Sequence, residues 1–381
     1  MMWEKVKLGD IASFSNGINF NKTAYEKGVK LIGVSNFGDR FYPDYLQLQE
    51  VKKDIVRPED CLRNGDIVFV RSNGNKELVG RCMLVKNPTE RVTYSGFCIR
   101  ARLNDTDRYD PVYFTYYFKS KAFRRAVSGT AVGANIQNLS QARLSNHDCN
   151  VPDIETQHRI ADILSAYDDL IENNQKQIKL LEEAAQRFYK EWFVDLHFPG
   201  YENTKIVDGV PEGWSRGLLK ELISVNYGKD HKKAPDDGNI PVYGSGGLMR
   251  KCNKSLFSGE AVLIPRKGSL NNIMYVDETF WTVDTMFYAT MKQPHTAVFV
   301  YFFVKAFDMY SMNIGAAVPS MTTKILDAMD VVIPDKETLE KFDKLTKTYF
   351  NKIKTLQGQN ERLKIARDLL LPKLMSGEVE V

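Results

Sequence analysis

The sequence predicts an α+β protein built from two copies of one unit, each a small mixed α/β domain followed by a long helix. Two observations support this prediction. The two halves of the chain align in the same order, and a heptad pattern of apolar residues follows each globular part. The chain has 381 residues, 43% of them hydrophobic, which is enough apolar material for more than one core. The predicted domains are residues 1–152 and 200–333, and the predicted helices are residues 153–199 and 334–381.

The repeat consists of four collinear matches whose offset falls along the chain. They pair Trp3 with Trp214, 65–69 with 259–263, Phe114 with Phe299, and 151–156 with 333–338, at offsets of 211, 194, 185 and 182 residues. The last match has four identities in six residues. Four matches in one order indicate duplication, and the falling offset indicates that the first copy carries small insertions.

Each globular part begins with a tryptophan and continues with short apolar runs bounded by glycine. The runs at 31–34, 67–70 and 262–264 predict strands that end in turns. The aromatic segments 113–123 and 298–307 predict buried helices. Strands combined with helices over about 130 to 150 residues predict a small mixed α/β domain in each copy.

The first long helix is predicted to start after Pro152, with Asp153 as its N-cap. Its apolar positions alternate in steps of four and three, which is the spacing of a coiled-coil seam. The seam residues are Ile160, Leu164, Tyr167, Ile171, Asn174, Ile178, Leu181 and Phe188. Asn174 is polar, and a single buried asparagine on a seam usually specifies register at a cost in stability.

The second long helix repeats this spacing less regularly. Its seam residues are Tyr349, Ile353, Leu356, Leu363 and Leu370, and the polar Thr346, Asn360 and Arg367 fall on the same seam. Gly358 should cost about 1 kcal/mol in a helix interior, and Pro372 predicts a kink or an end in the last turn. The two helices are predicted to form an antiparallel coiled coil. The alternative is that each helix packs only on its own domain.

Motifs of common enzymes are missing from the sequence. The five cysteines are scattered singly and the five histidines lie far apart, so neither a disulfide framework nor a metal site is predicted. No P-loop, dinucleotide-binding glycine motif or nucleophile elbow occurs. Asp44, Glu50 and Lys52 form a loose nuclease-like pattern that is better explained as a solvated polar edge. No stretch of 18 apolar residues and no apolar signal core occur, so we expect a cytoplasmic chain without a membrane partner.

Basic and amide residues gather in loops at matching places of the two copies. Net charge is only +4, but the segment 229–267 holds eight Lys or Arg against four Asp or Glu. Arginine can read guanine edges and asparagine can read adenine, while lysines suit phosphates. A glycine-rich loop at 243–247 lets backbone approach a phosphate. The candidate DNA-binding residues are Arg71, Asn73 and Lys76 in the first copy and Lys232, Lys233, Tyr243, Ser245, Arg250, Arg266, Lys267 and Asn271 in the second.

Together with this layout, three segments resemble the specificity subunits of type I restriction–modification systems. They are Val-Pro-Asp-Ile-Glu-Thr-Gln-His-Arg-Ile-Ala-Asp-Ile-Leu-Ser at 151–165, Glu191-Trp192-Phe193, and Leu-Leu-Leu-Pro-Lys-Leu-Met-Ser-Gly-Glu at 369–378. The resemblance implies that each domain reads half of a bipartite, asymmetric site in double-stranded DNA and that the helices space the half-sites. It also implies a non-catalytic chain without a cofactor. Two methyltransferase subunits that bind S-adenosylmethionine would dock on it, and separate restriction subunits would use ATP and Mg²⁺.

Two other classes stay open at this point. A self-contained nuclease or methyltransferase would show turnover by the purified chain supplied with DNA, Mg²⁺ and S-adenosylmethionine. A structural coiled-coil adaptor would lack salt-sensitive affinity for DNA.

Overall fold

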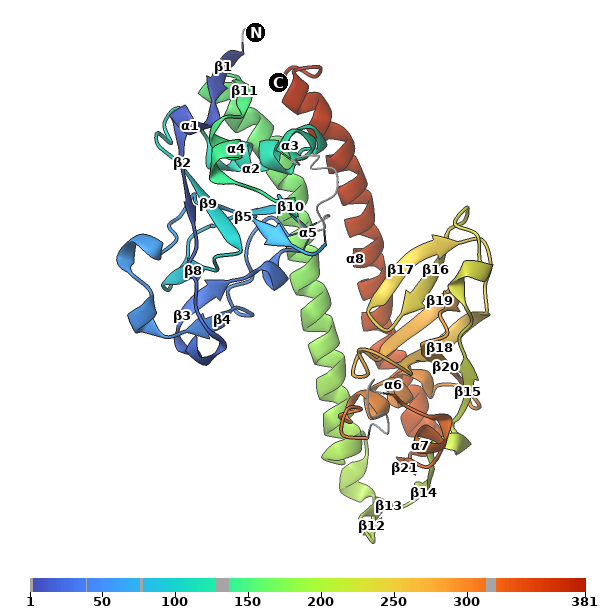
Figure 1. The fold of residues 1–381 in the computed structure, drawn as a ribbon. Coiled ribbons are helices and arrows are strands. Elements are labelled where there is room, and N and C mark those ends of the chain that lie inside the picture. The colour runs from blue at the N-terminus through green and yellow to red at the C-terminus, as the bar shows by residue number, and fades with distance from the viewer. Residues whose placement is uncertain (1–2, 39, 76–77, 128–136, 313–319) are drawn as a thin grey trace. The chain divides into compact units, whose positions relative to one another are not determined.

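The computed structural model describes residues 3–38, 40–75, 78–127, 137–312 and 320–381. The chain divides into two compact units (Figure 1). Unit 1 comprises residues 1–174 with 358–381, and unit 2 comprises residues 175–357. Each unit contains one globular part and a stretch of both long helices, so the predicted α+β class with two domains and two long helices is confirmed.

Unit 1 contains two small sheets and two short strand pairs. The antiparallel four-stranded sheet has the spatial order β2 (Ala12–Asn16), β9 (Cys98–Leu103), β5 (Ile67–Val70), β7 (Cys82–Leu84). The three-stranded sheet has the order β4 (Gln49–Val51), β3 (Tyr25–Ile32), β8 (Val92–Tyr94). The short pairs are β1 (Glu4–Lys7) with β11 (Asp148–Val151), and β6 (Ser72–Asn73) with β10 (Gln137–Asn138). All four residues of β5 are buried, as its continuous apolar run requires.

Four short helices accompany these strands: α1 (Leu8–Ile11), α2 (Pro111–Lys119), α3 (Lys121–Val127) and α4 (Gln141–Ser145). The single helix predicted over 113–123 is wrong, because the chain leaves helical geometry at Ser120. The Ser120 hydroxyl accepts the Phe123 N–H at 3.2 Å and so satisfies a donor at the start of α3. In α2, Tyr113, Phe114 and Phe118 are buried, which confirms the predicted buried character of this segment.

Unit 2 contains one six-stranded sheet and two short strand pairs. The sheet has the order β15 (Ile223–Tyr227), β20 (Met286–Met291), β18 (Phe257–Pro265), β19 (Met274–Thr282), β16 (Ile240–Gly244), β17 (Gly247–Cys252). The pairs are β14 (Ser215–Leu218) with β21 (Asp330–Ile333), and β12 (Ile206–Val207) with β13 (Val210–Pro211). The helices are α6 (Ala297–Lys305), which is buried at seven of its nine positions, and α7 (Thr323–Asp327).

The two units share one framework, which bears out the predicted repeat. Lys5 faces Asn150 in the β1–β11 pair, and Arg216 faces Val332 in the β14–β21 pair. The offsets of these partners, 211 and 182 residues, are those of the sequence matches. Helices α4 and α7 also start in the same way, because the N-cap hydroxyl accepts a backbone N–H three residues later in both.

The long helices are α5 (Ile154–Tyr189) and α8 (Lys336–Ser376). Asp153 accepts the Thr156 N–H at 2.8 Å, and Asp335 accepts the Thr338 N–H at 2.9 Å, so both helices start with an aspartate cap. The bond from Thr156 lowers the pKa of Asp153. A π-helical turn, Lys190–Val194, follows α5.

The long helices contact each other in antiparallel directions within each unit (Figure 1). The contacts are Asp168 with Arg367 and Asn174 with Asn360 in unit 1, and Phe188 with Tyr349 and Trp192 with Phe342 in unit 2. In both units, higher residue numbers in α5 meet lower ones in α8, which makes the pair antiparallel.

The predicted seam residues lie on the covered sides of these helices. Ile160, Leu164, Ile171, Asn174, Ile353 and Leu356 are buried, and Tyr167, Ile178, Leu181, Phe188, Tyr349, Leu363 and Leu370 are partly buried. The polar seam residue Thr346 donates to the Phe342 carbonyl at 2.8 Å, so its hydroxyl is satisfied within the helix.

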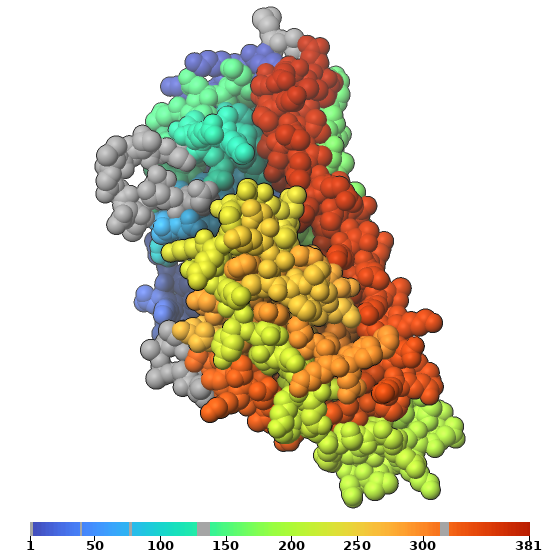
Figure 2. Space-filling model, turned by 90° about the vertical axis from the view of Figure 1, so that its right-hand side faces the viewer, coloured from blue at the N-terminus to red at the C-terminus, as the bar shows by residue number. Residues whose placement is uncertain are grey.

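Neither Gly358 nor Pro372 interrupts α8, which ends one turn after the proline. Gly377 follows with a φ of +72°, a left-handed conformation that suits a helix C-terminus. The Trp3 ring packs beside Gly377, so both chain ends lie together in unit 1. Figure 2 shows α8, coloured red to orange-red, with one flank uncovered.

Candidate nucleic-acid interface

In unit 1, Arg71 follows the central strand β5 and is held at three points. Its N–H donates to the Phe97 carbonyl at 2.8 Å, and its carbonyl accepts the Leu139 N–H at 2.9 Å. Its guanidinium donates to the Gly96 carbonyl at 3.1 Å. Since a guanidinium has five N–H donors, this bond fixes the orientation of the group and leaves other donors for a ligand.

In unit 2, Arg266 follows the central strand β18 and makes the same set of bonds. Its N–H donates to the Thr285 carbonyl at 2.8 Å, and its carbonyl accepts the Met321 N–H at 2.9 Å. Its guanidinium donates to the Asp284 carbonyl at 3.3 Å. The three partners stand at the repeat offsets from Phe97, Leu139 and Gly96. Arg71 and Arg266 therefore occupy equivalent places in the two copies.

The residues that follow these arginines differ between the units. In unit 1, Asn73 belongs to β6, and its side chain accepts the Asn75 N–H at 2.7 Å. Lys76 lies outside the described residues. In unit 2, the Lys267 side chain is exposed, and Asn271 donates to Asp308 at 2.9 Å. Asn271 thus supports the neighbouring loop.

The glycine-rich turn between β16 and β17 lies beside the Arg266 loop. The Ser245 carbonyl accepts the Asn272 side-chain N–H at 2.9 Å, which joins the two segments. Gly247 has a φ of +108°, a conformation that glycine adopts without steric cost. The Tyr243 hydroxyl donates to Glu278 at 2.6 Å. The structure therefore brings Ser245 close to the Arg266 loop.

Arg250 and the two upstream lysines have different surroundings. The Arg250 guanidinium donates to the His231 carbonyl, donates to the Ala234 carbonyl at 2.7 Å and pairs with Asp236. These bonds hold the short helical turn His231–Lys233 against β17. Lys232 and Lys233 project from that turn with exposed side chains. Arg250 positions the turn, while the lysines are open to a phosphate.

Tyr227 is a candidate residue that the sequence reasoning missed. It ends β15, is 54% exposed, and lies under the Arg266 guanidinium, which is 5.6 Å from its ring centroid. A cation–π contact of this kind restrains the guanidinium further. The sequence held no signal for this pairing, because 39 residues separate the tyrosine from the arginine.

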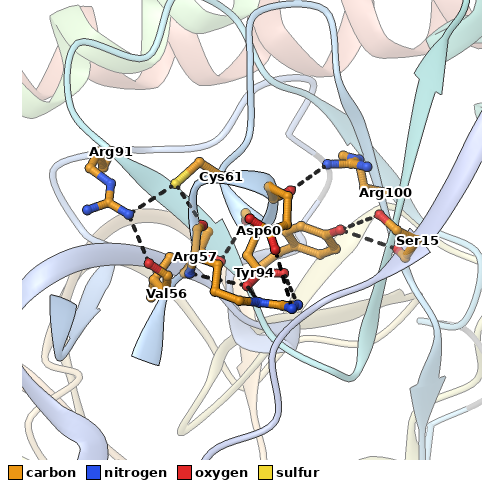
Figure 3. Close-up of polar contacts among 10 residues, drawn as sticks. Ser15, Val56, Arg57, Asp60, Cys61, Arg91, Tyr94 and Arg100 are labelled. Atoms are coloured by element: carbon orange, nitrogen blue, oxygen red, sulfur yellow. Dashed lines mark hydrogen bonds and ion pairs between the residues drawn. The ribbon is translucent and has the colours of Figure 1, made fainter. Parts of the chain in front are cut away.

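Unit 1 also carries a polar cluster around residues 56–61 that no local run of charge announced (Figure 3). Arg91 donates to the Val56 carbonyl at 3.0 Å, and Arg100 donates to the Glu59 carbonyl at 3.2 Å. Arg57 pairs with Asp60 at 3.0 Å, and this bond raises the pKa of the arginine. These arginines are bonded to the loop itself, so the cluster braces the surface of unit 1.

The loose nuclease-like pattern does not come together. Asp44 pairs with Arg40 at 2.9 Å, the Glu50 carboxylate accepts the Gly28 N–H at 2.6 Å, and Lys52 lies 3.7 Å from Glu26. In the parts of the chain that the structure describes, no group of three or more His, Cys, Asp or Glu side chains could hold a metal ion. No helix among the described residues is long and apolar enough to span a membrane.

With this geometry in view, comparison with known proteins defines the class as a DNA-specificity domain. A family model described as "Type I restriction modification DNA specificity domain" matches residues 2–183 and 211–364, once for each copy of the repeat. The chain belongs to this family of specificity subunits, which are non-catalytic by themselves and carry no cofactor.

Curated relatives share the full layout of the chain. The chain is 24% identical to the HindI specificity subunit of Haemophilus influenzae, over 99% of each chain. It is 26% identical to the MjaIX specificity subunit of Methanocaldococcus jannaschii, over 80% of this chain and 76% of the relative. A crystal structure of the S subunit of a type I system from M. genitalium matches 98% of this chain and 96% of its own, with a TM-score of 0.57 at 18% identity. That likeness shows a shared fold.

Proposed function

We propose that this specificity subunit reads a bipartite, asymmetric site in double-stranded DNA, with one globular part for each half-site. The observation that carries the proposal is the equivalence of Arg71 and Arg266, which are held by the same bonds in two copies of one framework. A guanidinium fixed in advance loses less freedom when it binds a guanine edge or a phosphate.

The surroundings of the two arginines support unlike half-sites. Arg266 has Tyr227 beneath it and the Ser245 turn beside its loop. At the offset of 211, the residue equivalent to Tyr227 in unit 1 is Asn16, so an aromatic side chain is replaced by an amide. Different side chains on one framework favour different bases. The site would therefore consist of two dissimilar short sequences.

The long helices would set the distance between the half-sites. This role assigns residues 1–152 and 200–333 to recognition, and 153–199 and 334–381 to the spacer. Insertion of one matched heptad into both helices keeps the seam in phase and lengthens the pair. The unread gap of the site should then change while both half-sites stay the same. An unchanged gap contradicts the spacer role.

Methyltransferase subunits would dock on exposed apolar side chains of the helix pair. In unit 1, Ile163 and Leu170 of α5 and Ile365 and Leu369 of α8 are 37%, 42%, 61% and 64% exposed. Apolar side chains gathered on one helix pair mark a protein interface. Leu170→Ser with Leu369→Ser should weaken copurification of the methyltransferase, whereas Leu46→Ser, in an exposed loop, should not. The partners would bring S-adenosylmethionine, and the restriction subunits would bring ATP and Mg²⁺.

The direct test is co-expression with the methyltransferase subunit of the same system, followed by methylation-aware sequencing of the host DNA. A single split motif with adenine methylation on both sides supports the proposal and identifies the site. If the complex forms but no motif is methylated, the DNA-reading role fails. Turnover by the purified chain alone with DNA, Mg²⁺ and S-adenosylmethionine would favour an enzyme instead.

A further inference from the structure

Helices α5 and α8 are two copies of one helix, so each has a second potential partner in another copy of the chain. At the offset of 182, the seam residues Tyr167 and Ile171 correspond to Tyr349 and Ile353. A purely apolar seam would fit α5 against α8 within a chain. It would fit α5 against α5, or α8 against α8, between two chains about as well.

One buried pair in unit 1 breaks this equivalence. The Asn174 side-chain N–H donates to the Asn360 side-chain carbonyl at 2.9 Å, and the two residues are 2% and 8% exposed. The residues equivalent to them are Leu356 and Ile178. The polar pair therefore occurs on one side of the duplication and an aliphatic pair of positions on the other.

The consequence is clear when the same antiparallel register is applied to two like helices. In an α5–α5 pair, Asn174 would stand opposite Ile178 of the second chain. In an α8–α8 pair, Asn360 would stand opposite Leu356 of the second chain. Each arrangement buries an amide against an aliphatic side chain without a hydrogen-bond partner, which is strongly unfavourable.

A second polar contact discriminates in the same direction. Asp168 pairs with Arg367, and the Tyr116 hydroxyl donates to Asp168 at 2.6 Å. The side chains of Asp168 and Arg367 are only 7% and 15% exposed. The equivalent residues are Phe350 and Ala185. In like-helix pairs, Asp168 would face Ala185 and Arg367 would face Phe350, so both charges would lose their partner.

We infer that these two polar layers, Asn174–Asn360 and Asp168–Arg367, select the pairing of α5 with α8 and exclude a second copy of the chain. They act as determinants of partner choice in a duplicated sequence, in the way that single buried polar residues do in coiled coils. Their effect concerns assembly and is the same whatever DNA the chain reads.

The test is to unfold the full chain, refold it over a series of concentrations without DNA, and measure the share of dimer by light scattering after size exclusion. The apolar variant replaces each polar residue by its equivalent: Asn174→Leu, Asn360→Ile, Asp168→Phe and Arg367→Ala. Its share of dimer should rise about tenfold over that of the natural chain. Asn174→Leu with Asn360→Ile alone is the smaller step and should raise the share less.

A matched control distinguishes pairing choice from general instability. Adding Ile178→Asn and Leu356→Asn to the apolar variant moves the asparagine layer to the equivalent positions, where it again fits only α5 against α8. The share of dimer should then fall back toward that of the natural chain. The inference is overturned if the apolar variant and the Asn174→Leu, Asn360→Ile variant both refold with the natural share of dimer. It is also overturned if the moved layer has no effect.

Discussion

The two units place opposite chemistry at equivalent positions of their helix pairs. In unit 1, Tyr116 donates to Asp168, which is paired with Arg367. In unit 2, the equivalent Tyr301 meets Phe350, with ring centroids 5.9 Å apart. The duplicated framework tolerates this exchange because its backbone pairs and helix caps are the same in both copies. The framework thus depends on backbone bonding, and the interior of each copy is free to differ.

The largest effect should separate the aromatic centre of unit 2 from the aliphatic one of unit 1. Phe342 is fully buried against Tyr189, Trp192 and Phe193, and its equivalent in unit 1 is Ile160. Phe342→Ala should lower the free energy of unfolding by about 4 kcal/mol and Ile160→Ala by about 3 kcal/mol, because the larger ring leaves the larger cavity. Denaturant titration measures both. Equal losses would show that the aromatic cluster adds nothing.

The next effect concerns the charged layer of unit 1. Arg367→Ala should lower the free energy of unfolding by about 3 kcal/mol, because it leaves the Asp168 carboxylate buried without its partner. Asp168→Phe with Arg367→Ala copies the residues of unit 2 and should recover most of the loss. Thermal unfolding compares the two variants. If the double variant is less stable than the single one, unit 1 cannot accept the chemistry of unit 2.

The two equivalent arginines should affect different halves of the methylated site. Arg71→Ala and Arg266→Ala should each relax one half-site and weaken DNA binding by about 1 to 3 kcal/mol, if the guanidinium reads a base. Methylation profiling of the complex shows which half changes. Arg57→Ala is the control, because that exposed arginine is already paired with Asp60. Identical changes in both half-sites would contradict one domain per half-site.

A smaller effect should distinguish the helix caps. Asp153→Ala removes one cap bond and should cost about 1 kcal/mol. Asp335→Ala should cost roughly 2 kcal/mol, because Asp335 also accepts the Trp214 ring N–H at 2.8 Å. Asparagine at either position keeps a cap and should restore much of the stability. Chemical denaturation with the four variants would show whether the tryptophan bond adds to the second cap.

The smallest effect is a pH dependence confined to unit 1. Burial lowers the pKa of His147 below its usual 6.5, and the Tyr117 hydroxyl lies 2.8 Å from its ring nitrogen. Protonation then favours the unfolded chain, so the stability of unit 1 should fall as the pH drops below about 6.5. The equivalent residue in unit 2 is Met329, which cannot titrate. Hydrogen exchange against pH should show the loss in unit 1 only, and His147→Gln should abolish it.

Periodicity and repetition were sufficient to predict much of the fold. The heptad spacing and Asp153 predicted the start of α5 correctly, because a cap and an apolar seam are local patterns. The falling offset predicted the shared framework of the two units. The break at Ser120 was missed, since the apolar pattern continues across it and only the serine cap interrupts the helix.

The candidate interface was predicted less completely. The matching loops at Arg71 and Arg266 were found from their place after a strand, and their equivalence is visible in their backbone bonds. The inward turn of Arg250 and the contact of Tyr227 with Arg266 depend on residues far apart in the chain. Side-chain direction in loops is decided by such partners, which composition does not reveal.

The sequence by itself determined the duplication, the α+β class, the two long helices and the absence of common catalytic motifs, because these follow from residue types at fixed spacings. The tertiary structure decided which polar seam residues meet. Asn360 and Arg367 read as defects in an irregular seam, yet they are the partners of Asn174 and Asp168. A buried polar group is stabilised only by a partner at hydrogen-bonding distance, and that partner comes from a helix almost two hundred residues away.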